Sequence, residues 1–265
     1  ASQDIHVPRV PHPRFHDKSA LGRRGDAMVQ LDWSVGAILA ELDKHDLAEN
    51  TLVIFTSDNG PTHHDESYST TKQISRISPN SGDGHDASGK WRGGKYQIYE
   101  GGTRVPLLIR WPGYIEPGTT AALVSQIDFL ASFAALLEIE LGEKEAPDSR
   151  NALASLLGKD PRGLPFMLEE ARGVALRVGD WKYIPGMQSA QDGGFFPEED
   201  CLYNLADDPG EQQNLYAKHS KRSQRLASFL KTLVSSESVR QIGSLVDIET
   251  SLAPQKMNGK SEKSL

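Results

Sequence analysis

The first part of the chain passes from a helical hydrophobic pattern to a strand-like one. Six apolar residues recur at intervals of three or four between positions 25 and 46, with charged residues between them: Met28, Leu31, Val35, Ile38, Leu39 and Leu42. This spacing predicts an amphipathic helix that packs against a large surface. Residues 51–57 are instead almost continuously apolar, which is typical of a strand covered on both faces in a parallel sheet. A helix followed by a buried strand indicates an α/β fold.

A long polar segment separates this strand from a second apolar run. Residues 60–104 hold eight glycines, and a connection of that length is typical of a functional loop or of a disordered one. Residues 105–113 then predict a second buried strand that ends at a Pro-Gly turn. Residues 127–137 predict a helix whose inward face carries four apolar residues: Leu130, Phe133, Ala134 and Leu137.

The rest of the chain predicts a small α+β subdomain. Residues 173–184 have the pattern of a hairpin that turns at Gly179-Asp180. A helix over residues 217–234 follows, with four apolar residues on one face: Leu226, Phe229, Leu230 and Leu233. The sequence therefore predicts four parts, which are an α/β domain over 1–140, a linker over 141–163, a subdomain of antiparallel sheet and helix over 164–238, and an irregular tail over 239–265.

Composition and charge exclude some classes of function. The net charge of −7 argues against a general nucleic-acid binder, which needs a basic face. We find no apolar run long enough to span a bilayer. No targeting segment is visible, and residue 1 is Ala rather than Met, so the sequence leaves open a signal upstream of it. The single cysteine, Cys201, permits no internal disulfide.

Asp58-Asn59-Gly60 follows the first predicted strand directly. Ligands bind at the carboxyl ends of strands in open α/β sheets, and Asp and Asn offer hard oxygen ligands suited to Ca²⁺ or Mg²⁺. The same three residues are also favourable for an ordinary turn. We therefore carry a metal site and a turn as alternatives at this position.

A glycine-rich basic segment offers candidate anion ligands. Arg92-Gly-Gly-Lys95 and Tyr99-Glu-Gly-Gly-Thr-Arg104 place one lysine and two arginines among glycines that let the backbone approach closely. A bound oxyanion fits that arrangement, with Lys as a point charge. A flexible, solvated loop is the alternative.

His6 is a candidate general acid. It lies just before two prolines, and its ordinary pKa of about 6.5 suits proton donation to a leaving oxygen near neutral pH. A lone His in a loop is also commonly an exposed polar side chain without a catalytic role. Spacing alone does not choose between His6 and four further histidines, which are His12, His16, His63 and His64.

Together these segments resemble the type I sulfatases, the arylsulfatase-like members of the alkaline-phosphatase-like superfamily. The resemblance covers residues 1–235 and runs in order through His6-Val-Pro-Arg-Val-Pro, the helix around Gln30, Asn50 to Pro61, Gly93-Gly-Lys to Arg104-Val-Pro, and Leu202 to Glu211. It implies an α/β fold with a mixed sheet flanked by helices, present in part here, and a small α+β carboxyl-terminal subdomain. It also implies export to a periplasm or to the exterior.

The resemblance assigns roles to the candidate residues. Asp58 and Asn59 become two of the Ca²⁺ ligands, Lys95 the sulfate ligand, and His6 the residue that contacts or protonates the ester oxygen. His85 is a further substrate-binding candidate, because Asp83-Gly-His85 is similar to a stretch near substrate in some members. A hydrated formylglycine would attack the sulfur, while the metal and Lys95 neutralise the sulfate oxygens.

The sequence departs from the family pattern in one respect. Formylglycine arises from a Cys/Ser-x-Pro-x-Arg motif, which is absent here, as is the family's amino-terminal pair of Asp ligands. Two oxygens do not hold a Ca²⁺ ion that prefers about six to eight. We therefore expect the chain to be the carboxyl-terminal portion of a sulfatase, inactive and weakly calcium-binding without its amino-terminal half.

Other functions remain open on the sequence alone. One is hydrolysis of phosphate or phosphonate esters by a member of the same superfamily. Another is a pseudoenzyme without a nucleophile that binds sulfated glycans or a partner chain. Aryl, steroid and glycan sulfates are all possible substrates, and the resemblance of residues 4–11 and 83–91 favours a sulfated carbohydrate.

Overall fold

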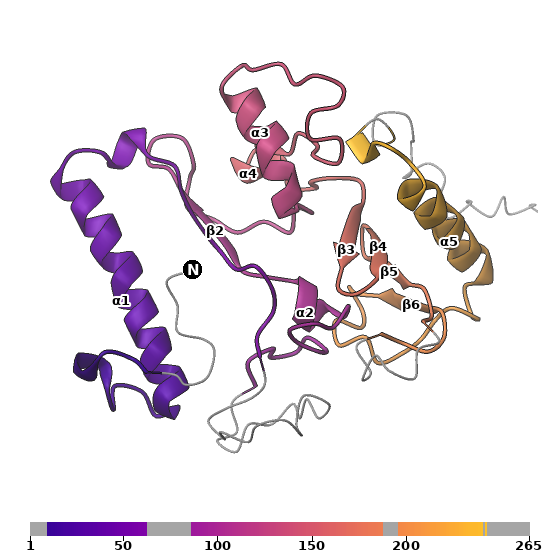
Figure 1. The fold of residues 1–265 in the computed structure, drawn as a ribbon, viewed down its shortest axis with the longest axis horizontal. Helices are drawn as coiled ribbons and strands as arrows, with labels where there is room; N and C mark the ends of the chain where they lie inside the picture. The colour runs from indigo at the N-terminus through magenta and orange to yellow at the C-terminus, as the bar shows by residue number, and fades with distance from the viewer. Residues whose placement is uncertain (1–9, 63–85, 188–195, 241, 243–265) are drawn as a thin grey trace, which may run out of the picture.

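The computed structural model describes residues 10–62, 86–187, 196–240 and 242. Its strands form two separate sheets, and the short helix α2 (Glu100–Thr103) lies between them (Figure 1). The first sheet follows α1 (Gly22–Lys44), and α3 (Phe129–Leu136) and α4 (Leu153–Leu156) lie between the two sheets in chain order. Three short 3-10 helices complete this part, which are η1 (Pro13–Phe15), η2 (Ala48–Asn50) and η3 (Gln126–Asp128).

The first sheet pairs β1 (Val53–Thr56) with β2 (Leu107–Arg110) in antiparallel register, from Val53 opposite Arg110 to Thr56 opposite Leu107. Both predicted strands are confirmed, but the parallel pairing that the apolar run at 51–57 indicated is wrong for these two strands. An apolar run reports burial on both faces and carries no information on the direction of the partner strand. β1 is only half-buried among the described residues.

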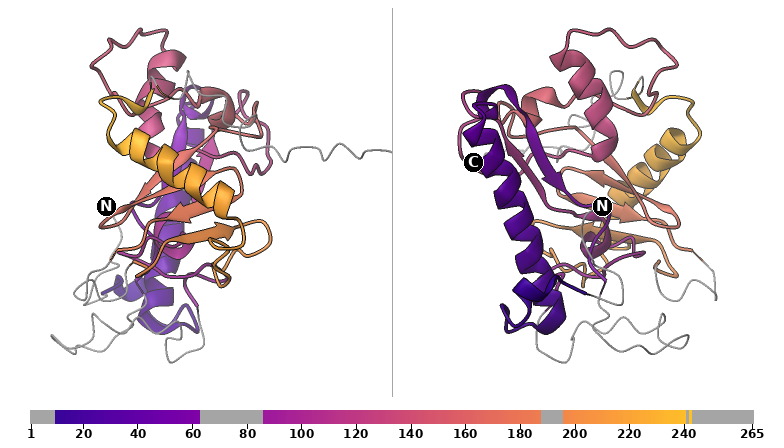
Figure 2. Two further views of the ribbon diagram at one scale, coloured as in Figure 1. Left: turned by 90° about the vertical axis from the view of Figure 1, so that its right-hand side faces the viewer. Right: turned by 60° about the vertical axis from the view of Figure 1, so that its left-hand side comes forward.

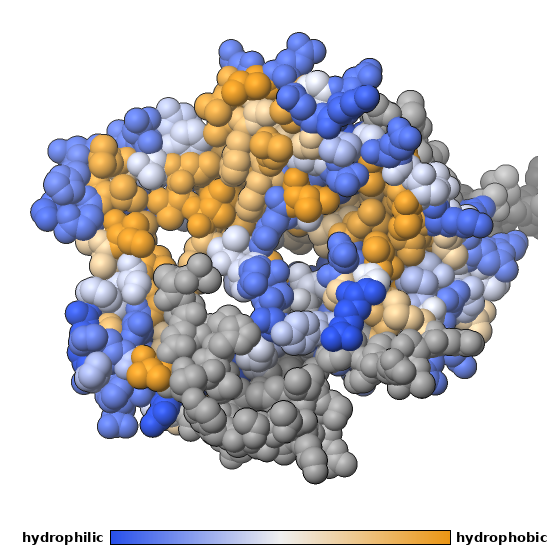
Figure 3. All heavy atoms as spheres, viewed as in Figure 1, coloured by the Kyte–Doolittle hydropathy of each residue, from blue (hydrophilic) through white to orange (hydrophobic). Residues whose placement is uncertain are grey.

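The helix predicted over 25–46 is confirmed as α1, yet its apolar stripe is incompletely covered. Met28 and Ile38 are 52% and 59% exposed, and the buried residues of α1 are confined to its first turns. In Figure 3, hydrophobic surface runs from the upper part of α1 across the first sheet towards α3. Beyond its first turns, α1 therefore keeps apolar side chains such as Ile38 exposed.

The inward face predicted for the helix over 127–137 is partly wrong. Leu130 and Leu137 are 56% and 66% exposed, whereas Ser132 is fully buried. The Ser132 hydroxyl donates to the carbonyl oxygen of Asp128 at 2.6 Å and accepts from the backbone N–H of Ala152 at 2.9 Å. These bonds turn the polar side of α3 towards the segment that leads into α4, because buried backbone groups need partners.

The second sheet has the antiparallel order β3-β4-β5-β6. Its strands are β3 (Met167–Glu170), β4 (Val174–Val178), β5 (Trp181–Ile184) and β6 (Cys201–Asn204). The predicted hairpin is confirmed, and Gly179 at its turn has φ +54°, a left-handed conformation that Gly adopts readily. Cys201 begins β6.

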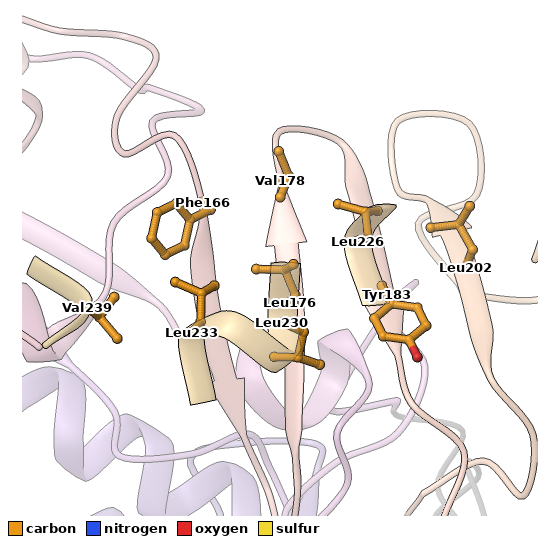
Figure 4. Close-up of a cluster of buried hydrophobic side chains, with 9 residues drawn as sticks. All are labelled: Phe166, Leu176, Val178, Tyr183, Leu202, Leu226, Leu230, Leu233 and Val239. Carbon is orange, nitrogen blue, oxygen red and sulfur yellow. The ribbon is translucent and has the colours of Figure 1, made fainter. Parts of the chain in front are cut away.

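Helix α5 (Ser220–Val234) covers one face of this sheet, and it crosses the strands in Figure 2. Leu226, Leu230 and Leu233 point from one side of the helix into a cluster with Leu176 and Leu202 of the sheet (Figure 4). Full burial of a Leu side chain contributes about 2 kcal/mol to folding. The predicted helix and its apolar face are confirmed, and they form the main core of the carboxyl-terminal part.

The opposite face of the second sheet packs against the segment before α2. Ile98 and Tyr99 are buried there against Ala175, Ile184 and Tyr203. The glycine-rich segment is therefore attached to the carboxyl-terminal sheet. No helix among the described residues is long and apolar enough to cross a membrane.

Candidate functional site

The Asp58-Asn59-Gly60 turn lies at the carboxyl end of β1, as the sequence predicted. The Ser57 hydroxyl donates to the carbonyl oxygen of Asn59 at 3.0 Å and shapes the turn. The side-chain amide of Gln126 donates to the carbonyl oxygen of Ser57 at 2.5 Å and to the Thr56 hydroxyl at 3.0 Å. The end of β1 is therefore held in place by a residue about seventy positions away.

Asp58 and Asn59 present oxygen atoms suited to a hard cation. Asp58 is exposed and Asn59 is half-buried. The amide nitrogen of Asn59 donates to the carbonyl oxygen of Gly60 at 2.8 Å, so its amide oxygen Oδ1 lies on the opposite side of the group. These atoms fit part of a Ca²⁺ shell, which takes about six to eight oxygens. Within 10–62, 86–187, 196–240 and 242, no three His, Cys, Asp or Glu side chains form a group that could hold a metal.

The Lys95 loop, defined as residues 92–104, contacts this turn directly. The backbone N–H of Lys95 donates to the carbonyl oxygen of Pro61 at 2.8 Å. The backbone N–H of Gly60 donates to the carbonyl oxygen of Gly102, also at 2.8 Å. A Cβ atom on Gly60 would lie 1.8 Å from the carbonyl oxygen of Gly101, so only glycine permits this approach. The turn and the Lys95 loop, more than thirty residues apart in sequence, are thus brought together.

The three cations of the loop have different surroundings. Arg92 stacks 3.8 Å from the ring centroid of Tyr99, and Arg104 donates to Glu100 at 3.1 Å. Both arginines therefore hold the loop together. Lys95 is half-buried with its ammonium 5.3 Å from the ring centroid of Tyr96, within range of a cation–π contact. Its role as an anion ligand stays a prediction.

The backbone next to Lys95 is strained. Tyr96 has φ +75°, a left-handed conformation that is unusual for a bulky residue. Such residues persist only where the surrounding structure holds them, and they cluster at functional sites. No sequence pattern indicates this conformation, which supports a functional role for the Lys95 loop.

The candidate histidines fall into two groups. His6, His63, His64 and His85 lie outside the described residues. His12 and His16 belong to the turn around η1, where a ring nitrogen of His16 lies 2.9 Å from the carbonyl oxygen of Pro11. Burial raises the pKa of the Cys201 thiol, which disfavours the thiolate that a cysteine nucleophile needs.

Sequence reasoning missed a group of buried charges behind the Lys95 loop. Lys182 in β5 is fully buried, and its ammonium lies within ion-pair distance of Glu100, Glu169 and Glu211. The sequence offered one indication of this group, which is a lysine at an inward position of the otherwise apolar strand β5. It did not indicate the partners of that lysine.

These features define an α/β protein in which a glycine-rich cationic loop meets a turn that carries carboxylate and amide oxygens at the end of a strand. Residues 4–139, just over half of the chain, match the family model described as Sulfatase. The chain therefore belongs to the sulfatase family, and its structural neighbours are sulfatases of alkaline-phosphatase-like fold. The predicted family and fold class are both confirmed.

Two curated relatives and two solved structures illustrate the match. The chain is 42% identical to an N-acetylgalactosamine-6-O-sulfatase of Bacteroides thetaiotaomicron and 34% identical to human Arylsulfatase A, in each case over 88% of this chain and 46% of the relative. A structure from work on the metabolism of multiple glycosaminoglycans by Bacteroides thetaiotaomicron gives a TM-score of 0.78 at 40% identity, covering 88% of this chain and 49% of the other. The PsFucS1 sulfatase from Pseudoalteromonas sp. gives a TM-score of 0.69 at 25% identity, covering 89% of this chain and 48% of the other. The chain spans about half the length of these proteins.

Proposed function

We propose that this chain supplies the calcium- and sulfate-binding part of a sulfatase that hydrolyses a sulfate ester. The observation that carries the proposal is the pair of backbone hydrogen bonds, Lys95 to Pro61 and Gly60 to Gly102, both 2.8 Å long. They join a strand end rich in hard oxygen ligands to a loop that carries a lysine. A small tetrahedral anion with several negative oxygens suits both parts of such a site.

Each candidate site residue has a defined task in this proposal. Asp58 and Asn59 hold Ca²⁺, which when bound would neutralise a sulfate oxygen. The Lys95 ammonium binds a second sulfate oxygen and stabilises the charge that develops as the ester bond breaks. His6 donates a proton to the departing alcohol oxygen, and His85 contacts the substrate.

The nucleophile belongs to residues outside this sequence. The family's formylglycine motif, Cys/Ser-x-Pro-x-Arg, is absent from the 265 residues, so we propose that the active protein contains it elsewhere together with the remaining Ca²⁺ ligands. The exposed apolar side chains Ile38 of α1, Leu108 of β2 and Leu130 of α3 support a further segment that packs against this part of the chain. The chain without that segment would be inactive and would bind Ca²⁺ weakly.

We propose a sulfated carbohydrate as the substrate. The identity of 42% over 88% of this chain to an N-acetylgalactosamine-6-O-sulfatase supports this choice. A polymeric glycan does not cross a membrane unaided, so action in a periplasm or outside the cell accompanies this proposal.

Kinetics of the full-length protein that carries this sequence test the proposal. We expect Ca²⁺-dependent release of sulfate from a 6-sulfated amino sugar, and no turnover of the matching phosphate ester. Lys95→Ala should lower kcat/KM by about 10²- to 10³-fold, as loss of one charge-stabilising donor does. Lys159→Ala, at an exposed position, is the control and should change kcat/KM by less than twofold.

Three outcomes would contradict the proposal. Faster hydrolysis of the phosphate ester would assign the site to phosphoryl chemistry. Binding of sulfated glycans without turnover would assign a pseudoenzyme. Full activity in the Lys95→Ala variant would show that Lys95 does not bind the sulfate group.

A further inference from the structure

Lys182 is the centre of a buried ionic cluster. Its ammonium nitrogen lies 2.7 Å from Oε2 of Glu169, 3.0 Å from Oε1 of Glu100 and 3.4 Å from Oε1 of Glu211. All four side chains are buried, with Lys182 and Glu211 fully enclosed. A buried charge without partners is strongly unfavourable, so an ammonium at this position needs acidic side chains beside it.

The strand register places Lys182 on the face of the second sheet that looks towards the Lys95 loop. Lys182 is paired with Arg177 of β4 and with Tyr203 of β6, and cross-strand partners share one face. Tyr203 belongs to the cluster that includes Ile98 and Tyr99 of the loop. The opposite face, with Tyr183, packs against α5.

The three carboxylates come from separate parts of the chain, and each one is tied to the Lys95 loop. Glu100 belongs to the loop itself. Glu169 of β3 accepts from the Thr103 hydroxyl at 2.6 Å. Glu211, which follows β6, accepts from the backbone N–H of Glu100 at 2.7 Å. Lys182 therefore joins the loop to two other segments through one ammonium group.

Two arginines extend the cluster on either side of Lys95. The Arg92 guanidinium donates to the carbonyl oxygen of Glu211 at 2.9 Å. Arg177 of β4 donates to Glu100 at 3.1 Å. The loop is thus held at residue 92 before Lys95 and at residues 100 and 103 after it.

The charge balance keeps the cluster ionic. Burial opposes the charge on Lys182, but the facing carboxylates raise its pKa above the ordinary value, so it stays protonated. Burial likewise opposes the charge on Glu100, yet Lys182 and Arg177 lower its pKa below the ordinary value. The ion pair between Lys182 and Glu100 therefore persists through the neutral range.

We propose that Lys182 is a positioning residue that fixes the Lys95 loop against the Asp58-Asn59 turn, so that the carboxyl-terminal sheet sets the geometry of the sulfate site. The anchored loop includes Tyr96, whose backbone is strained, and Gly101, whose carbonyl oxygen lies against Gly60. Its consequence for catalysis rests on the proposed sulfatase function. The anchoring itself does not depend on that function.

Three variants of the full-length protein test this role. Lys182→Met removes the ammonium at similar length, Lys182→Arg keeps the charge, and Glu100→Gln keeps the shape while removing one carboxylate. The matched control is Glu170→Gln, because Glu170 is exposed on β3 next to Glu169. Each variant is assayed for backbone hydrogen exchange and, at a temperature where circular dichroism shows it folded, for kcat and KM.

We expect the exchange of the Gly60 and Lys95 amides to quicken at least tenfold in Lys182→Met, while amides of α5 keep their protection. A misplaced ligand costs about 10²-fold in rate, so kcat/KM should fall by roughly 10- to 100-fold in Lys182→Met, mainly through kcat. Lys182→Arg should recover part of this loss. Glu170→Gln should match the wild type in every measurement.

The outcomes separate the anchoring from the function. Inactive wild-type protein would contradict the proposed function, while the exchange data would still test the anchoring. Active wild-type protein with unchanged exchange and kcat/KM in folded Lys182→Met would overturn the positioning role. If Lys182→Met does not fold, the same criteria apply to Glu100→Gln.

Discussion

Glu211 gives the sharpest test of the electrostatics behind the Lys95 loop. Its side chain is fully buried, and Oε1 has no hydrogen-bond partner among the described residues. Burial raises its pKa from the ordinary 4.5 to about 7, against the opposing effect of Lys182. The perturbation is Glu211→Gln, which keeps an oxygen acceptor for the Glu100 N–H and removes the titration.

Proton binding to Glu211 determines whether the free energy of unfolding rises or falls with pH. Between pH 4.5 and 7 the unfolded chain has released the Glu211 proton and the folded protein retains it, so the free energy of unfolding falls as pH rises through this window. The contribution of protonated Glu211 to the free energy of unfolding is complete below pH 4.5 and is lost above pH 7. A pKa change from 4.5 to about 7 corresponds to about 3 kcal/mol. The lowered pKa of Glu100 acts in the opposite direction, but only in acid, as pH falls below 4.5.

Urea denaturation of wild type and Glu211→Gln at pH 5, 6, 7 and 8 measures the effect. We expect the Gln variant to be more stable than the wild type by about 1 kcal/mol at pH 5 and by about 3 kcal/mol at pH 8. Glu170→Gln, at an exposed position of β3, should follow the wild type throughout. A stability difference between wild type and Glu211→Gln that is constant from pH 5 to 8 would show that Glu211 does not titrate in this range.

Two further pairs of substitutions test the packing by urea denaturation. Gly60→Ala should cost more than about 2 kcal/mol, since overpacking costs about 1–3 kcal/mol and the new Cβ would meet the carbonyl oxygen of Gly101 at 1.8 Å. Gly36→Ala, in the open interior of α1, should instead stabilise by about 1 kcal/mol, and an equal loss in both variants would disprove the contact. Leu230→Ala should cost about 3 kcal/mol through the cavity it leaves under α5. Val234→Ala, at an exposed position, should stay within about 0.5 kcal/mol, and a small loss for Leu230→Ala would contradict the assigned core.

Local patterns predicted the elements whose cause is local. The three-and-four spacing of Leu226, Leu230 and Leu233 located α5 and its buried face. The Gly179-Asp180 pair located the hairpin of β4 and β5. The position of Asp58 at the end of β1 followed from the end of an apolar run. In each case the relevant neighbours lie within a few residues along the chain.

The same patterns were less informative where a surface or partner lies far away in sequence. Leu130 and Leu137 match the helical period, but hydrogen bonds from Ser132 to the segment around Ala152 decide which side of α3 is buried. The apolar character of residues 51–57 predicted a strand and left the antiparallel direction of its partner undetermined.

The sequence alone determined the family, the principal helices and strands, and the candidate pair of a metal-binding turn and a lysine loop. The contact of Lys95 with Pro61 and the pairing of Lys182 with Glu100 and Glu211 are visible only in the folded chain. Periodicity records burial and local geometry, whereas ion pairs and loop contacts depend on which distant segments fold together.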